Sequence, residues 1–178
     1  KCGFCGEAGH NRRDCPTMKQ FLADAYKANE NWRRAAYDKL VGKLGISVGA
    51  AIRVKESSWR DDSPEHVALI TQVNWDKLSL ACALDGWNSR DYAGQLTVAA
   101  IVNGQTQNIK FEDSLIKPEF VRQGWYGVKY VGKIANAPKP LDPSWVTDYR
   151  EAFDYLVKKR SFERLEEIGF VALVDKWK

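Results

Sequence analysis

Four side chains able to bind a metal ion crowd into the first fifteen residues of this 178-residue chain. They follow the pattern C-x2-C-x4-H-x4-C and are Cys2, Cys5, His10 and Cys15. Thiolate sulfur and imidazole nitrogen are the donors that zinc usually takes in a tetrahedral site. The two-residue gap lets the first two cysteines bind from one tight turn, and the longer gaps bring the other two donors around the ion. Residues 2–15 therefore predict one zinc ion.

This segment is too short to build a hydrophobic core, so the metal must supply its folding free energy. Gly6 and Gly9 stand beside the ligands, where glycine permits the positive φ that tight turns need. All four positions around the ion are filled by protein donors, which leaves none for water or substrate. We therefore expect a structural site rather than a catalytic one.

Residues 2–15 resemble a CCHC zinc knuckle of the retroviral nucleocapsid type, with "CG" at the second ligand and "GH" at the third. Members of that family bind single-stranded RNA or DNA by stacking bases on apolar knuckle residues and placing basic residues at the phosphates. The resemblance implies that Phe4 stacks on a base, although an aromatic residue more often follows the first cysteine directly, where this chain has Gly3. It also implies that the side chains of Asn11, Arg12 and Arg13 contact the backbone of the nucleic acid.

Other interpretations of the cysteines fit less well. A thioredoxin-like C-x-x-C at Cys2 and Cys5 would need a βαβ pattern, which does not follow. A disulfide framework would leave an odd cysteine and give His10 no role. Some CCHC knuckles bind proteins, so protein docking stays an alternative. Three cysteines that bind zinc as thiolates imply a reducing compartment, so we expect the protein in the cytoplasm or nucleus. A virus particle or a virus-infected cell is a further location that the sequence allows.

The charge is distributed unevenly. Residues 1–43 hold nine Lys and Arg against five Asp and Glu, whereas the rest of the chain holds eighteen of each, so the whole net charge of +4 lies near the cysteine cluster. Such an excess favours an anionic partner. We therefore add Arg33 and Arg34 of the following helix to the predicted nucleic-acid contacts. The alternative is an ordinary solvated helix face, which also carries Lys19 and Lys27.

The elements predicted to position these residues start with a basic amphipathic helix over residues 17–45, begun by a capping box at Thr17 and Gln20 and ended by Gly42 and Gly45. "ANENW" at 28–32 could divide it. Short runs rich in Val, Ile and Leu then predict strands at 49–57, 66–75, 77–84, 95–102, 107–111 and 124–134. Hairpins are expected in "VNWDKLSL" and in "IVNGQTQNIKF", where Asn103-Gly104 is the stronger turn signal.

The resulting fold class is α+β, with a small antiparallel β-barrel over residues 46–135. The strand rhythm of "VGAAIRVK…ALITQVNWDKLSL" is similar to the start of SH3-like barrels of the KOW and Tudor kind. Residues 1–16 form the knuckle and 17–45 the helical segment. Residues 136–178 give a proline-containing linker and C-terminal helices packed on the barrel, with Ser161 capping a helix that stops at Gly169 and a final strand or packed tail after it.

No motif of an enzyme is evident. The sequence has no P-loop, no G-x-S-x-G and no second metal cluster. Asp61, Asp62, Glu65 and His66 gather between two predicted strands, in a composition that solvated loops usually have. Several aromatic residues could line a groove but more often pack in a core or a hairpin; they are Trp59, Trp75, Trp87, Trp125 and Tyr126. The sequence contains no run of 18 apolar residues, so we expect no membrane-spanning helix.

The sequence therefore predicts a non-enzymatic protein that binds single-stranded RNA or DNA through a zinc knuckle and a basic helix, with a body that can dock on another protein or assembly. The alternatives are a structural or assembly protein of a virus particle or ribonucleoprotein, whose knuckle docks on protein, and an accessory subunit of a nucleic-acid enzyme.

Purified protein should contain one equivalent of zinc per chain, because the four ligands are complete within one segment. Elemental analysis measures this directly. A preparation with no zinc, or with two equivalents, would contradict the single structural site.

Overall fold

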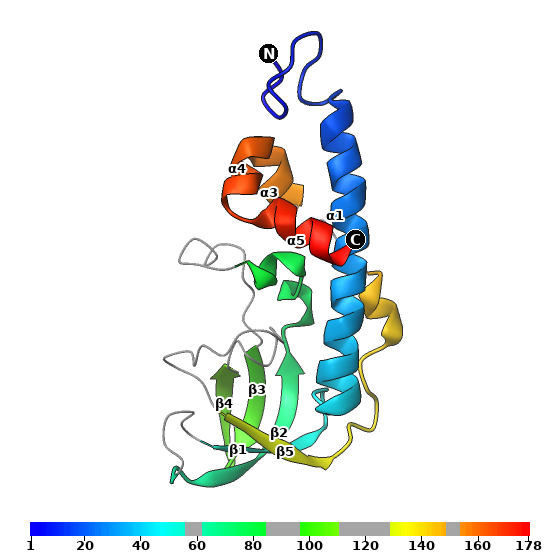
Figure 1. Ribbon diagram of the computed structural model, residues 1–178. Coiled ribbons are helices and arrows are strands. Elements are labelled where there is room, and N and C mark those ends of the chain that lie inside the picture. Colours follow the sequence, from blue (N-terminus) through cyan, green and yellow to red (C-terminus); the bar gives the residue numbers. More distant parts are fainter. Residues whose placement is uncertain (56–61, 85–96, 111–128, 149–153) are drawn as a thin grey trace. The chain divides into compact units, whose positions relative to one another are not determined.

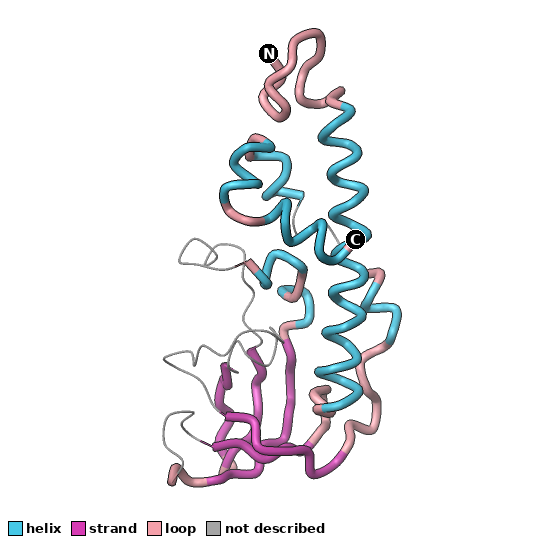
Figure 2. The backbone as a smooth tube through the Cα atoms, in the orientation of Figure 1, coloured by secondary structure: helices cyan, strands magenta, loops and turns pink. Residues whose placement is uncertain are grey.

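The computed structural model describes residues 1–55, 62–84, 97–110, 129–148 and 154–178, and combines helices with one antiparallel sheet (Figures 1 and 2). The chain divides into two compact units. Unit 1 comprises residues 1–34, 79–94 and 147–178, and unit 2 comprises residues 35–78 and 95–146. The C-terminal residues thus group with the N-terminal cysteine segment.

The long helix α1 runs from Pro16 to Tyr37, and "ANENW" at 28–32 does not divide it (Figure 1). Ala28 and Trp32 are buried, and they continue the apolar face that Phe21 and Ala25 begin. This unbroken three-to-four spacing outweighs the weaker helix propensity of the asparagines. A π-helical turn, η1 (Asp38–Lys43), follows, and Gly45 at φ 69° ends the helical segment close to its predicted end.

The sheet of unit 2 is open rather than closed into a barrel. Its strands are β1 (Ala51–Lys55), β2 (Glu65–Val73), β3 (Thr97–Val102), β4 (Gln105–Lys110) and β5 (Lys129–Ala135). They pair in the order β4-β3-β2-β1-β5, so that β4 and β5 form the two edges, and all the pairings are antiparallel. The prediction of an SH3-like barrel is therefore wrong for the described residues, while the α+β class is confirmed.

The missing strand was expected at residues 77–84. That segment forms the 3-10 turns η2 (Trp75–Lys77) and η3 (Leu80–Ala83), so the hairpin predicted in "VNWDKLSL" does not form. Leu78, Ser79 and Leu80 are all buried, without the alternation of a half-exposed strand. A continuous apolar run of this length fits either a strand or a buried helical turn, and periodicity cannot separate the two.

The β3–β4 hairpin is confirmed. Asn103 has φ 50° and Gly104 has φ 77°, as a type I′ turn requires. One face of the sheet is buried, including Ile52, Ile70 and Val98. On the other face Leu69 lies directly opposite Ile101, and both are exposed together with Val67.

The C-terminal segment of unit 1 forms three short helices in its described part, joined by turns of two residues. A 3-10 turn, η5 (Pro143–Val146), precedes it in the chain, and the helices are α3 (Asp154–Lys159), α4 (Phe162–Glu167) and α5 (Phe170–Trp177). Ser161 caps α4 as predicted, since its hydroxyl accepts a hydrogen bond from the Arg164 N–H at 3.2 Å. The strand considered for the last residues is wrong, because Phe170 and Val174 bury one face of a helix at i and i+4.

Several sequence predictions concern residues outside the described part, including Trp59, Asp61, Trp87, Trp125 and Tyr126. Among the described residues, no helix has an apolar stretch long enough to cross a membrane.

Replacing Gly104 with Ala should lower the free energy of unfolding by about 1–2 kcal/mol, because a Cβ is strained at positive φ. No atom lies within 4 Å of the added Cβ, so the effect is conformational and not a clash. Denaturant unfolding measures it. Asn103→Gly is the control and should change stability little, since glycine accepts the same conformation. Equal losses from both variants would contradict this turn geometry.

Candidate metal centre

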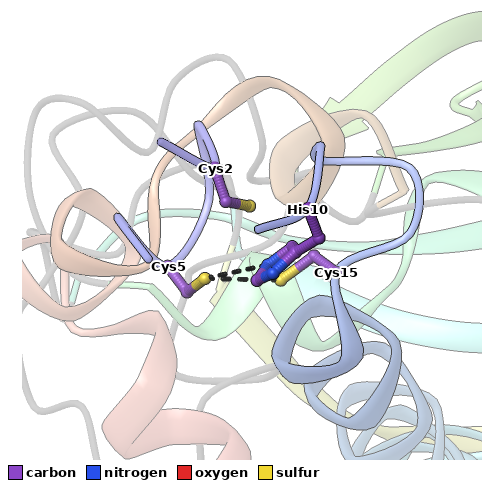
Figure 3. A group of neighbouring side chains, drawn as sticks. All are labelled: Cys2, Cys5, His10 and Cys15. Carbon is purple, nitrogen blue, oxygen red and sulfur yellow. Dashed lines mark hydrogen bonds between the residues drawn. The ribbon is translucent and has the colours of Figure 1, made fainter. Parts of the chain in front are cut away.

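The four predicted ligands converge at one point (Figure 3). Their donor atoms all lie within 4.8 Å of one another. Cys5 Sγ is 3.3 Å from His10 Nε2 and 3.7 Å from Cys15 Sγ. Thiolates about 2.3 Å from a central ion form a tetrahedron with edges of about 3.8 Å. The spacing therefore fits one metal ion held by three sulfurs and one nitrogen.

The backbone of the loop holds these donors in place. The N–H of Cys2 donates to the Glu7 carbonyl at 2.7 Å, and the N–H of Gly6 donates to the Cys2 carbonyl at 2.9 Å. Gly6 and Gly9 have φ of 79° and 93°, which confirms their predicted role in the turns. Within the described part of the chain this is the one group of at least three histidine, cysteine or acidic side chains that can hold a metal ion.

Cys15 joins the metal centre to helix α1. Its carbonyl accepts a hydrogen bond from the Lys19 N–H at 3.1 Å, and its Sγ accepts one from the Met18 N–H at 3.4 Å. The sulfur thus takes the place of the oxygen of a conventional N-cap residue. The capping box predicted from Thr17 is wrong, and Pro16 was the better signal, because proline favours the first position of a helix.

Hydrogen bonds to the sulfurs of Cys2 and Cys5 affect the pKa values of these two thiols. Burial opposes ionisation of Cys2, but hydrogen bonds from the backbone of Cys5 and Phe4, and from the Cys15 and Cys5 thiols, lower the pKa of Cys2 to about 6. At Cys5 a backbone hydrogen bond at Glu7 favours the thiolate, yet burial and the neighbouring thiols Cys15 and Cys2 raise its pKa above the ordinary value. Binding of a metal ion to these thiols displaces the protons that they still carry.

Phe4, the predicted base-stacking residue, lies in the interior of unit 1. Its ring is only 2% exposed and packs against Phe21 and Phe162, with centroid separations of 6.3 and 5.8 Å. The N–H of Phe162 also donates to the Phe4 carbonyl at 2.9 Å. A ring in this position offers no free face to a base.

Arg12 is also directed inward. One terminal nitrogen donates to the Gly3 carbonyl at 2.8 Å, and the other donates to the carbonyls of Val157, at 2.6 Å, and Arg160. These two carbonyls stand at the C-terminal end of α3, where helices leave acceptors unsatisfied. The guanidinium also lies 5.4 Å from the Phe4 ring centroid. Arg12 therefore links the metal-binding loop to α3.

The other four predicted nucleic-acid contacts divide by exposure. Arg33 is 2% exposed and donates to the Asp148 carbonyl at 3.4 Å, so it belongs to the interior of unit 1. Arg13 and Asn11 are exposed, and the Asn11 side chain accepts a hydrogen bond from the Asp14 N–H at 3.1 Å. Arg34 is exposed as well and pairs with Glu30 at 3.3 Å.

Sequence reasoning missed the partners of the loop, which are Phe21, Phe162 and the α3 carbonyls. A signal for the aromatic contacts was present in the pattern: Phe162 follows the capping residue Ser161, and Phe21 lies on the apolar face of α1. Nothing local in the sequence links Arg12 to a residue 145 positions later.

Comparisons with known proteins do not assign this chain to a family. No family model matches the sequence, and no curated protein or solved structure is significantly similar to it. The geometry of the candidate metal centre and the surface beside it are therefore the features that bear on function.

Replacing Phe4 with Ala should lower the free energy of unfolding of unit 1 by about 3–5 kcal/mol, because it removes a fully buried ring. Denaturant unfolding in the presence of metal measures the loss. Val67, which is 59% exposed on β2, provides the control, and Val67→Ala should stay within about 0.5 kcal/mol of the parent. If Phe4→Ala were equally mild, the ring would not be a core residue.

Proposed function

We propose that the metal is zinc and that its role is structural. Three thiols and one imidazole at tetrahedral spacing support zinc over the hard cations, which prefer oxygen ligands. All four ligand positions come from the protein, so none is left for a substrate. A reducing compartment, cytoplasm or nucleus, follows from the three thiolates.

We further propose that the protein is non-enzymatic and binds single-stranded RNA or DNA through exposed cations of unit 1. The supporting observation is a row of cations on one exposed face of α1. Lys19, Lys27 and Arg34 fall within about 80° of arc at 3.6 residues per turn, and they span roughly 22 Å along the axis. The last two side chains are each 61% exposed. Arg13, exposed on the metal-binding loop, adds a fourth positive charge to this set.

Glu30 reduces the field of this row, since it lies 3.9 Å from Lys27 and 3.3 Å from Arg34. Exposed ion pairs of this kind contribute about 0–1 kcal/mol, which is too little to keep the cations from a polyanion. Phe4 and Arg12 are omitted from the proposed surface because of their inward contacts. Binding would accordingly be mainly electrostatic, with little base stacking by the loop.

The second candidate is a structural or assembly protein of a virus particle or ribonucleoprotein, whose zinc segment contacts protein. One observation favours it. The loop already uses its aromatic ring and one arginine to contact helices of its own chain, as a protein-docking knuckle would contact another chain. The nucleic-acid interpretation stays first because the exposed cations continue beyond that contact along α1.

The proposal is tested with a fluorescent single-stranded oligonucleotide titrated by anisotropy at several salt concentrations. Four phosphate contacts give a slope of log K against log salt near −3, at about −0.7 per contact. The double variant Arg13→Ala/Lys19→Ala should reduce the magnitude of that slope by roughly 1.4. Binding should weaken most at low salt, where counterion release contributes most.

The matched control is Lys139→Ala, which removes one exposed positive charge from unit 2. It should leave both affinity and slope unchanged. If the double variant bound like the parent, or if the parent bound no oligonucleotide at low salt, the assembly-protein candidate would replace this one.

A further inference from the structure

The metal-binding loop carries two side chains that contact the C-terminal helices, and each lies between two ligands in the sequence. Phe4 stands between Cys2 and Cys5, and Arg12 stands between His10 and Cys15. A bound ion fixes the backbone on both sides of each residue, and it therefore fixes where each side chain can reach.

The contacts made by these two residues are concentrated on a short stretch of α3 and α4. Arg12 donates to the carbonyls of Val157 and Arg160, and Phe4 both packs on Phe162 and accepts its N–H. The hydrogen bond from Arg12 to the Gly3 carbonyl ties the two halves of the loop to each other. Both docking contacts thus depend on one closed loop.

The closed loop in turn depends on the metal. Without its metal the loop has no core of its own, because its large apolar side chain, Phe4, points away from the loop and packs on α1 and α4. The four thiol and imidazole donors would then have no force holding them within 4.8 Å of one another. Loss of the ion should therefore release Phe4 and Arg12 together.

We propose that metal binding and docking of α3 and α4 are one coupled step, transmitted by Phe4 and Arg12, so that metal occupancy controls whether residues 154–167 are docked or released. This inference rests on the zinc site proposed above and is independent of nucleic-acid binding. Linkage makes the coupling reciprocal: docking of α3 and α4 strengthens metal binding by the same factor by which the bound metal strengthens docking. The metal thereby acts as a conformational switch as well as a local staple.

The first test uses the full-length, zinc-loaded protein and amide hydrogen exchange read by mass spectrometry. Removing zinc with a chelator should increase exchange in peptides covering residues 154–167. Peptides from β2 and β3 in unit 2 should change little, since those strands contain no ligand. If α3 and α4 stay protected after zinc is removed, the coupling is overturned even though the zinc site itself stands.

The second test measures zinc affinity by competition with a chromophoric chelator, without oligonucleotide. Arg12→Ala removes no ligand but should weaken zinc binding about ten-fold, the effect of losing charge-assisted hydrogen bonds to α3. It should also speed exchange in α3 of the zinc-loaded protein. Arg13→Ala, an adjacent exposed arginine with the same change of charge, is the matched control and should leave zinc affinity and exchange unchanged.

Phe162→Leu supplies a variant outside the loop, in case Arg12→Ala does not fold. It keeps an apolar side chain in the cluster but loses the ring contact with Phe4, so zinc affinity should fall although no residue near a ligand has changed. Zinc affinities equal to that of the parent in both Arg12→Ala and Phe162→Leu would overturn the proposal. Unequal affinities of Arg13→Ala and the parent would show that charge alone, and not docking, controls zinc binding.

Discussion

The structure of unit 1 depends on the inability of a fifteen-residue loop to bury enough apolar surface to fold by itself. Two attachments solve this problem together. A cation can draw four donor atoms into a tetrahedron, and one arginine and one phenylalanine anchor the loop to helices. Because the anchoring residues alternate with the metal ligands along the same short loop, we infer that neither the loop nor its contact with α3 and α4 is an independent module.

That arrangement also explains the start of α1. Cys15 belongs to the donor set, and its sulfur receives the Met18 N–H in the first turn of the helix. With a divalent ion bound, the three thiolates would leave a net charge of about −1 beside the helix N-terminus, where negative charge is favoured. Cys15 therefore couples the candidate metal centre to α1, the longest helix among the described residues.

The features that could be predicted from the sequence were local. Ligand spacing located the metal centre, Asn103-Gly104 located a hairpin, and Ser161 located a helix start, because each depends on neighbouring residues. The features that could not be predicted depend on distant contacts. The carbonyls that accept from Arg12 lie about 145 positions away, and no short pattern distinguishes an exposed knuckle arginine from one that caps a helix. For Leu80 and its neighbours, burial on all sides removed the alternation that identifies a strand.

The strand order has a consequence for how the sheet assembles. Strands β1 to β4 follow one another as a meander, so each pairing closes a comparatively short stretch of chain. Strand β5 instead pairs with β1, where Lys55 lies opposite Lys129. Closing that long interval costs more chain entropy, which places this pairing late in folding. Until β5 arrives, the backbone edge of β1 is unpaired, so the nascent sheet has a second open edge, besides β4, at which another chain can pair.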